Sequence, residues 1–294
     1  MTAQNTVFDR FVQLLTVECL DCNYYRGMAT PGGKGRAFGG QIIGQALMAA
    51  ARTVPQGRMP HSLHAYFIRA GDSAQPVLYQ VSRDRDGGSF NTRRVVAIQG
   101  GQPILNMSSS FQIVEPGLSH QSEMPDVPPP EELMNEQQLA EAYPDKMPER
   151  LRHYLSVNRP IEIRPCILRP PYDHTPKPPQ YAAWIRAKGK MPDDPLINRV
   201  GLAFASDMGL LSVSLMPHGK GFSDPDMRSA SLDHSVWLHD DLRLDEWLLY
   251  AADSPWAGGA RGFSRGRIFT RDGRQVADTA QEGLVRQIGY QDPA

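Results

Sequence analysis

The chain has 294 residues, which is enough for two domains of ordinary size, and 40% of them are hydrophobic. Its net charge of −1 excludes a strong attraction of the whole chain to nucleic acid or to anionic membranes, so neither is predicted as a partner. Three cysteines do not make a disulfide framework in a chain of this length. We therefore expect a reducing, cytoplasmic location.

Signals for targeting and for metal binding are weak. No run of about 20 apolar residues predicts a membrane span. The short apolar run beside Asp9 and Arg10 is not typical of a secretory signal, and the last three residues do not match the peroxisomal tripeptide. Cys19 and Cys22 form a C-x-x-C pair without two further ligands at a suitable spacing. We therefore predict no metal and no cofactor.

The first half of the chain predicts one buried helix followed by antiparallel strands. Phe8–Leu15 has a helical period and is expected to form a lead-in helix, and Gln41–Arg52 reads as a buried central helix after a glycine pair. The Gly100-Gly101 pair indicates a hairpin. Strands are predicted at Ser62–Arg69, Val77–Arg83, Arg93–Gln99 and Pro103–Val114.

A proline-rich linker, Gly117–Pro130, and a polar helix, Glu131–Ala142, separate this half from a second one. The second half predicts a strand at Tyr181–Ala187 and a helix at Leu196–Leu211. Four strands follow, at Ser229–His239, Glu246–Ala252, Gly262–Thr270 and Gln275–Arg286. Asp272-Gly273 is predicted to turn the last hairpin.

The two halves carry the same pattern about 170 residues apart. His64–Tyr79 is similar to His234–Leu249, and Gly87–Gly101 matches Gly259–Gly273. A period this long indicates two copies of a whole fold rather than a solenoid. We predict an α+β protein in which each copy is an antiparallel sheet covered by one helix. The predicted boundaries are residues 1–118, a linker with a helix at 119–159, and residues 160–294.

One carboxylate of the second half stands among apolar neighbours. Asp207 continues the apolar stripe of the predicted helix Leu196–Leu211, three residues after Phe204. A carboxylate on a buried face is costly unless it is hydrogen-bonded, and such groups are enriched at functional sites. An aspartate that caps a loop fits the pattern equally well.

Two further polar side chains lie on predicted strands. Alternation places Gln281 on one face with Thr279 and Gly283, although a glutamine can also satisfy a strand edge. Ser231 falls on the more polar face of Ser229–His239. It can therefore meet Asp207 only through a bulge, a twist or the end of the strand.

Three other patterns are set aside. Gly262–Gly266 matches G-x-S-x-G, but a hairpin pattern follows it and no histidine occurs after His239. Asp233-His234-Ser235 cannot form a catalytic triad, because neighbours on a strand point to opposite faces. His61 and His64 have no carboxylate cluster beside them and are expected to be structural.

Nearly the whole chain resembles the acyl-CoA thioesterase II family, whose members carry two hotdog folds in one chain. The first half matches at FGGQIIGQAL (Phe38–Leu47), HSLHAYFIRAGD (His61–Asp72) and GGSFNTRRVVAIQGGQPI (Gly87–Ile104). The second half matches at WIRAKGKMPDD (Trp184–Asp194), ASDMGLL (Ala205–Leu211), SLDHSVWLH (Ser231–His239), DEWLLY (Asp245–Tyr250), ARGFSRGRIFTRDG (Ala260–Gly273) and AQEGLVR (Ala280–Arg286). Residues 117–160 match least.

The resemblance implies hydrolysis of acyl-CoA thioesters to free fatty acid and CoA by two tandem hotdog folds. The family's aspartate, hydroxyl residue and glutamine, which hold the attacking water, fall on Asp207, Ser231 and Gln281. The hydroxyl residue is commonly threonine, so Ser231 is a departure that keeps the hydroxyl and loses a methyl group. No covalent intermediate is implied, and assembly into homo-oligomers is expected.

Acyl-CoA is thus the expected partner, and its phosphates need cations. The candidates are Arg93, Arg94, Arg265 and Arg267, although arginines on exposed strands are often only solvated. A hotdog hydratase is a second hypothesis, but it would want a histidine with a carboxylate in its site. A non-catalytic acyl-CoA-binding protein is a third, and it would bind without turnover whether or not Asp207 is present.

Overall fold

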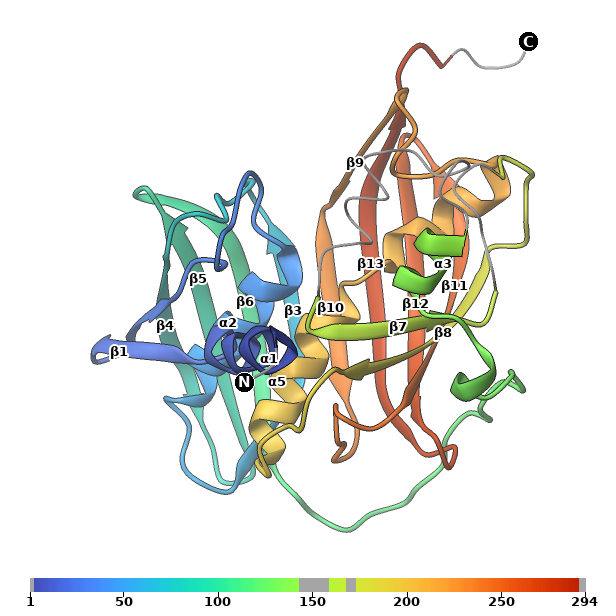
Figure 1. The fold of residues 1–294 in the computed structure, drawn as a ribbon. Coiled ribbons are helices and arrows are strands. Elements are labelled where there is room, and N and C mark those ends of the chain that lie inside the picture. Colours follow the sequence, from blue (N-terminus) through green and yellow to red (C-terminus); the bar gives the residue numbers. More distant parts are fainter. Residues whose placement is uncertain (1–2, 143–158, 168–172, 291–294) are drawn as a thin grey trace.

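The structure is a computed structural model, and it describes residues 3–142, 159–167 and 173–290. The chain forms two halves that lie side by side, with the N-terminal half in blue and green and the C-terminal half in yellow to red (Figure 1). Each half wraps a curved antiparallel sheet around one central helix, which confirms the prediction of two tandem hotdog folds in the α+β class.

The N-terminal half begins with α1 (Ala3–Leu14) and a hairpin that the sequence did not predict, β1 (Val17–Asp21) and β2 (Tyr24–Gly27). The central helix α2 (Gly39–Ala51) follows, almost where the apolar run predicted it. The meander comprises β3 (Arg58–Phe67), β4 (Val77–Asp86), β5 (Phe90–Gln99) and β6 (Gln102–Ile113). Each strand predicted in this half is therefore confirmed.

The C-terminal half repeats this order with changes. The predicted polar helix is two pieces, η1 (Pro130–Glu132) and α3 (Glu136–Ala142), and β7 (Ile161–Pro165) was not predicted. The central helix α5 (Pro195–Ser206) is followed by a separate 3-10 helix, η3 (Leu210–His218). The strands are β8 (Gln180–Ala187), β9 (Met227–Ser231), β10 (Asp233–Leu238), β11 (Leu248–Gly258), β12 (Arg261–Thr270) and β13 (Gln275–Gln287).

One sheet runs through both halves. Its strand order is β1-β2-β4-β5-β6-β3-β10-β13-β12-β11-β8-β7, and β9 pairs with β13 off this path. The halves are joined where β3 pairs antiparallel with β10, for example Ala65 with His234. One hydrophobic cluster includes residues of both central helices and of both parts of the sheet, so the two copies share a core.

The helices α2 and α5 pack closely because glycines leave room between them. A Cβ atom built on Gly40 would lie 2.2 Å from the carbonyl oxygen of Phe204, a separation that no real side chain tolerates. Gly44, one turn further along α2, faces Val200 with ordinary spacing. The glycine pair that precedes the apolar run thus brings the start of α2 against the end of α5.

The segment that includes α5 and η3 is long and strongly hydrophobic. Among the described residues, Pro195–His218 is long and hydrophobic enough to cross a membrane, but 72% of its most apolar window is buried inside the protein. Val200 and Leu202 of α5 belong to the shared hydrophobic cluster and have no exposed surface, and η3 packs on β11, β12 and β13. The segment serves as the core of the C-terminal half.

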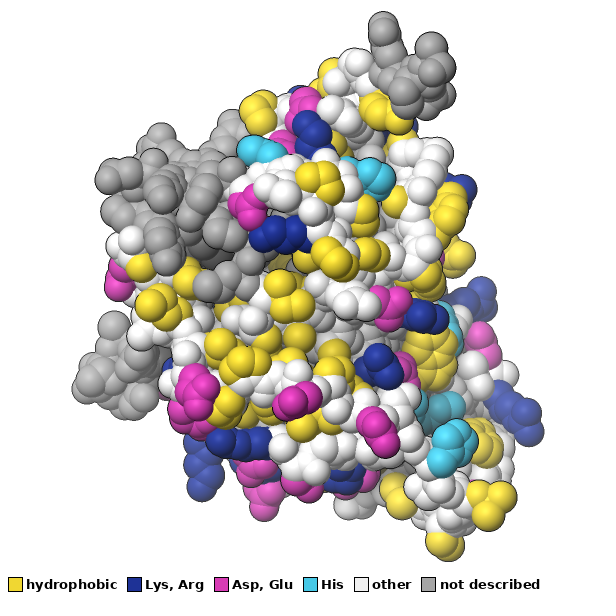
Figure 2. Space-filling view, turned by 90° about the vertical axis from the view of Figure 1, so that its right-hand side faces the viewer, with side chains coloured by type: hydrophobic (Ala, Val, Ile, Leu, Met, Phe, Trp, Pro, Cys, Tyr) yellow, Lys and Arg dark blue, Asp and Glu magenta, His cyan; other side chains and the backbone are white. Residues whose placement is uncertain are grey.

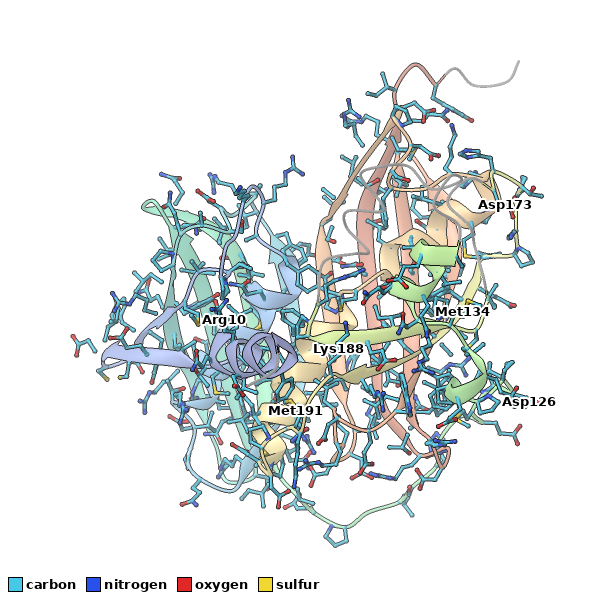
Figure 3. All side chains as sticks on the ribbon, viewed as in Figure 1. Arg10, Asp126, Met134, Asp173, Lys188 and Met191 are labelled. Atoms are coloured by element: carbon cyan, nitrogen blue, oxygen red, sulfur yellow. The ribbon has the colours of Figure 1, made fainter. Side chains whose placement is uncertain are left out.

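The linker after β6 covers the outer face of the C-terminal sheet. Met124, Val127 and Leu133 pack on a second apolar cluster, and the indole N–H of Trp184 donates to the carbonyl of Pro128 at 2.9 Å. Asp126 and Met134 lie along this half in Figure 3. Acidic and basic side chains are interspersed with hydrophobic ones on the side shown in Figure 2.

Candidate active site

Asp207 stands at the end of α5 and not inside a longer helix. The predicted helix Leu196–Leu211 is too long, because α5 ends at Ser206 and Asp207 is its C-terminal cap residue. Gly209 then adopts a left-handed backbone (φ 81°) that redirects the chain into η3. The prediction placed Asp207 inside the apolar stripe of a longer helix, whereas the structure makes it the residue that ends α5 and lines a cleft.

The start of α2 supplies the environment of this carboxylate. The backbone N–H of Gly40 donates to Asp207, and a Cβ on Gly39 would lie 2.7 Å from the Oδ2 atom. Burial raises the pKa of Asp207 to about 6, although the bonds from Gln281 and Gly40 lower it in part. The positive end of a helix therefore meets a carboxylate that is ionised at neutral pH.

Ser231 reaches Asp207 because the predicted strand Ser229–His239 is broken. It divides at Leu232 into β9, which ends at Ser231, and β10, which begins at Asp233. β9 pairs with one end of β13, whereas β10 pairs with its other end and with β3. The end of the strand, one of the three routes that alternation left open, brings Ser231 to the site.

Gln281 joins the other two side chains. Its Nε2 atom donates to Asp207 Oδ1 at 2.6 Å and to Ser231 Oγ at 3.1 Å. Gln281 is 1% exposed and lies on the predicted face of β13. Its Oε1 atom and the hydroxyl of Ser264, the residue opposite it on β12, are both buried without a protein partner. The Oε1 atom therefore faces the interior, and the Nε2 atom is the part of the amide that holds the side chains of the site.

The three residues line one open cleft of about 500 Å³. The start of α2 contributes Phe38 and Gly39 to its wall, so the cleft lies between the two halves. The rest of the lining combines apolar side chains, including Met208, Leu211, Phe222 and Met227, with the polar Arg228 and Ser229. A cleft where polar groups converge between apolar side chains, and where one carboxyl has a raised pKa, is a usual form of a small-molecule site.

A buried polar cluster supports the end of α5 from below. The hydroxyl of Ser206 donates to the carbonyl of Ala203 at 2.9 Å and contacts His234 Nε2 at 2.8 Å. Burial lowers the pKa of His234 to about 3, so its ring is neutral and carries its proton on the nitrogen that faces Ser206. Sequence reasoning missed this cluster, because it joins the end of α5 to a residue of β10 that is 28 positions away in the chain.

The structure does not bring the four predicted arginines to the cleft. Arg93 is fully buried and bonds Thr53 and Asp86, so its prediction as a phosphate-binding residue is wrong. Arg94 lies on the outer face of β5 near Asp84. Arg265, which pairs with Asp253, and Arg267 lie on the face of β12 opposite Ser264.

Among the described residues, the one cation that lines the cleft is Arg228 on β9, which sequence reasoning missed. Its Nη1 atom donates to the carbonyls of Pro225 and Met227, which aligns the guanidinium along the strand. The sequence offers no signal for it, because an arginine at a strand start is usually just solvated.

The motifs that the sequence analysis set aside have structural roles. Ser264 of the G-x-S-x-G match lies within β12 and not at a strand-to-helix turn. His61 contacts Ser110, and His64 contacts Ser235 across the β3–β10 junction. In the part of the chain that the structure describes, no three His, Cys, Asp or Glu residues are grouped as metal ligands would be.

Comparison with known families agrees with this architecture. A family model for acyl-CoA thioesterase matches residues 151–284, and a model for the acyl-CoA thioesterase N-terminal domain matches residues 28–112. A hotdog-fold protein from Alicyclobacillus acidocaldarius, at 18% identity and a TM-score of 0.73, supports the fold alone.

Several relatives match over almost their full length. The chain is 38% identical to acyl-CoA thioesterase 2 of Haemophilus influenzae over 280 residues, which cover 95% of this chain and 98% of that protein. It is 42% identical to human acyl-coenzyme A thioesterase 8, over 93% of this chain and 88% of that one. The crystal structure of acyl-CoA thioesterase II from Mycobacterium marinum superposes with a TM-score of 0.76 at 37% identity, covering 96% of this chain and 98% of that one. The chain belongs to the acyl-CoA thioesterase II family, and it is a thioesterase.

Proposed function

We propose that the protein hydrolyses acyl-CoA thioesters to free fatty acid and CoA, with a water molecule activated by Asp207 and positioned by Ser231 and Gln281. The observation that carries the proposal is the amide of Gln281, which bridges Asp207 and Ser231 at the floor of the cleft. The names of the relatives supply the substrate class.

Asp207 is the general base in this proposal. A base works best when its pKa lies just below the working pH, and burial raises the pKa of Asp207 to about 6. The carboxylate then remains ionised at neutral pH and is more basic than an ordinary aspartate. It would take the proton of the water as the oxygen attacks the thioester carbon, and give it to the CoA sulfur as the carbon–sulfur bond breaks.

Ser231 and Gln281 hold the water in line for attack. The hydroxyl of Ser231 accepts from Gln281 and so keeps its own hydrogen to donate to the water. The Nε2 atom of Gln281 fixes both Ser231 and Asp207 around that water. An oriented water avoids much of the entropic cost of a bimolecular step.

The proposal contains no covalent acyl-enzyme. Among the described residues, Ser229 and Ser231 are the hydroxyl residues that line the cleft. The hydroxyl of Ser229 is buried without a partner, and that of Ser231 contacts the amide of Gln281, which is no base. The nearby His234 faces Ser206 instead. A serine without a base is a weak nucleophile, so direct attack by water fits the geometry better.

The start of α2 is suited to stabilise the oxyanion. The first N–H groups of a helix have no intrahelical partner, and Gly40 uses its own on Asp207. The N–H of Gly39, which lines the cleft, is our candidate for the donor to the developing oxyanion. Arg228 takes the place of the predicted arginines as the candidate cation for a CoA phosphate.

The decisive experiment measures release of free CoA thiol from a panel of short- to long-chain acyl-CoAs by the wild type and by Asp207→Asn. Loss of the base should lower kcat by about 100-fold or more while the variant stays folded. Rapid-quench analysis should show no burst of thiol before the steady state. Thiol release that is unchanged in Asp207→Asn would overturn the role of this residue. Binding of acyl-CoA without thiol release would point to a binding protein.

A further inference from the structure

Asp207 and Gln281 are linked directly by a hydrogen bond between their side chains. They are also linked indirectly, by hydrogen bonds that start at the backbone of α5. The hydroxyl of Tyr250, on β11, donates to the carbonyl of Ser206 at 2.8 Å. Ser206 is the residue before Asp207 and the last residue of α5. Tyr250 therefore fixes the peptide from which the side chain of Asp207 projects.

The same hydroxyl is bonded to the strand that carries Gln281. Tyr250 Oη lies 2.9 Å from Thr279 Oγ1 on β13. The single hydrogen of the tyrosine is used on Ser206, so the hydrogen of Thr279 points to Tyr250. Thr279 and Gln281 are two residues apart on one face of β13. The route thus runs from Asp207 through Ser206, Tyr250 and Thr279 to Gln281, whose amide returns to Asp207.

A glycine on the strand between β11 and β13 leaves space for the contact between Tyr250 and Thr279. β12 lies between β11 and β13, and Gly266 of β12 pairs with Thr279. A Cβ atom on Gly266 would lie 2.3 Å from the ring of Tyr250 and 2.9 Å from Thr279 Oγ1. The missing side chain leaves the space through which the tyrosine reaches across β12. The route is also dry, since Tyr250, Thr279 and Ser206 are all buried.

We propose, on the basis of the function above, that Tyr250 and Thr279 are positioning residues that hold Asp207 at its working distance from Gln281. Neither side chain lines the cleft, so neither touches substrate. Their role is to tie the backbone of the base to the strand that carries its partner. A carboxylate tethered only through its side chain could rotate with the end of the helix, whereas one held at both ends cannot.

The N-terminal half provides a matched control. Tyr79, on β4, is also a fully buried tyrosine, and its hydroxyl donates to Gln45 Oε1 at 2.8 Å. No described contact connects Tyr79 or Gln45 to Asp207, Ser231 or Gln281. Tyr79→Phe and Tyr250→Phe therefore remove the same buried hydroxyl from corresponding sheets, one remote from the site and one beneath it.

The test measures kcat, KM and the dependence of kcat on pH for the wild type, Tyr250→Phe, Thr279→Val, Thr279→Ser and Tyr79→Phe. Tyr250→Phe should lower kcat about 10-fold with KM nearly unchanged, because a misplaced base costs rate and not binding. The acid limb of its kcat–pH profile should move to higher pH. The bonds from Gln281 and Gly40 lower the pKa of Asp207, so this pKa should rise when the bonds weaken. Thr279→Val should act in the same direction with a smaller effect, and Thr279→Ser should restore the wild-type values.

Two further results bear on the inference. The double variant Tyr250→Phe/Thr279→Val should be little worse than Tyr250→Phe alone, because both break one route. Tyr79→Phe should keep the wild-type kcat and acid limb even if it unfolds at a lower temperature. Tyr250→Phe that behaves like Tyr79→Phe would overturn the inference while leaving the proposed function intact.

Failure of the proposed function would look different. If the wild type released no thiol from any acyl-CoA, the titration of the Asp207 carboxyl carbon would be followed by NMR in the same variants. A higher pKa in Tyr250→Phe and Thr279→Val, but not in Tyr79→Phe, would support the positioning role. Equal titration in all variants would overturn it.

Discussion

The two halves share one fold, but each has a buried glutamine whose amide is bonded in a different way. In the N-terminal half the amide of Gln45 is fully satisfied: its Nε2 donates to the carbonyls of Leu14 and Met28, and its Oε1 accepts from Tyr79. In the C-terminal half the amide of Gln281 binds Asp207 and Ser231, and its Oε1 has no partner. A closed set of bonds stabilises a core, whereas an amide that holds two side chains of a cleft arranges them for a ligand.

The comparison extends to the ends of the two central helices. α2 ends at a cap residue, Arg52, whereas the cap residue of α5 is Asp207, held by the start of α2. The N-terminal copy thus contributes a helix start and the C-terminal copy contributes the side chains. The site therefore lies between two copies that contribute different parts, and neither copy could form it alone.

The largest effect should come from separating the two helices. Gly40→Ala would place a methyl group 2.2 Å from the carbonyl of Phe204, so α2 must move and its N–H must leave Asp207. We expect kcat to fall by about 100-fold or more and stability to fall by about 3 kcal/mol. Thiol release and thermal unfolding measure the two effects.

Gly44→Ala, in the same helix, is the control for that variant. Its new methyl group would make only ordinary contacts of 3.4 Å or more, and alanine favours helix over glycine by about 1 kcal/mol. It should be as active as the wild type. Full activity in Gly40→Ala would show that the contact between the helices does not matter to the site.

A smaller effect should separate the two glutamines. Gln281→Leu removes a donor from Asp207 and Ser231, and we expect activity to fall by about 10- to 100-fold with little change in stability, since solvent in the cleft can replace the bonds. Gln45→Leu leaves Tyr79 and two carbonyls unsatisfied, which should cost about 1–3 kcal/mol and leave kcat unchanged. Equal loss of activity in both would contradict the contrast between a structural and a functional amide.

The smallest expected effect concerns pH. The pKa of Asp207 is raised from 3.8 in an unfolded chain to about 6 in the native state, so the native state binds more protons between these values. Stability therefore falls as pH rises through this window, and kcat/KM should fall below about pH 6 as the base is protonated. The free energy of unfolding of Asp207→Asn at pH 7 should exceed that of the wild type by about 2 kcal/mol. This figure includes a reduction because Asp207 contacts the solvent in the cleft.

Denaturant unfolding at several pH values tests the last prediction. The advantage of Asp207→Asn should vanish below about pH 4, where the wild-type carboxyl is protonated in both states. If Asp207→Asn were less stable than the wild type at every pH, Asp207 would be a residue that stabilises the fold. Its ionised carboxylate would then not lower the stability of the protein for the sake of function.

Much of the fold could be predicted from local patterns. The apolar period of α2, the alternation in β3–β6 and β11–β13, and the long repeat all follow from side-chain spacing, which the backbone geometry of helices and strands imposes. β1 was missed because four of its five residues are exposed. β2 was missed because its four residues are too few for their alternating burial to be recognised. β7 is a five-residue strand at the sheet edge, too short for a period to be seen. The division into domains, the cytoplasmic location and the oligomeric state stay predictions.

The site was predicted less evenly. Gln281 was found from alternation along a regular strand, and Asp207 from its place within a predicted apolar stripe. The family resemblance then favoured a functional role for each over a structural one. Arg93 shows the limit: a strand arginine looks like a phosphate ligand until the fold buries it against Thr53 and Asp86. Arg228 shows the converse, because only the cleft gives it a role.

The sequence by itself determined two copies of one fold, their helices, most of their strands, and which copy carries the polar residues. Only the tertiary structure decided that α5 stops at Ser206, that the strand breaks at Leu232, and that the start of α2 meets Asp207. The physical reason is that periodicity reports how one segment presents its side chains, whereas a site depends on how segments distant in sequence approach. That approach is set by close packing at places such as Gly40 and Gly266, where an absent side chain leaves no periodic signal.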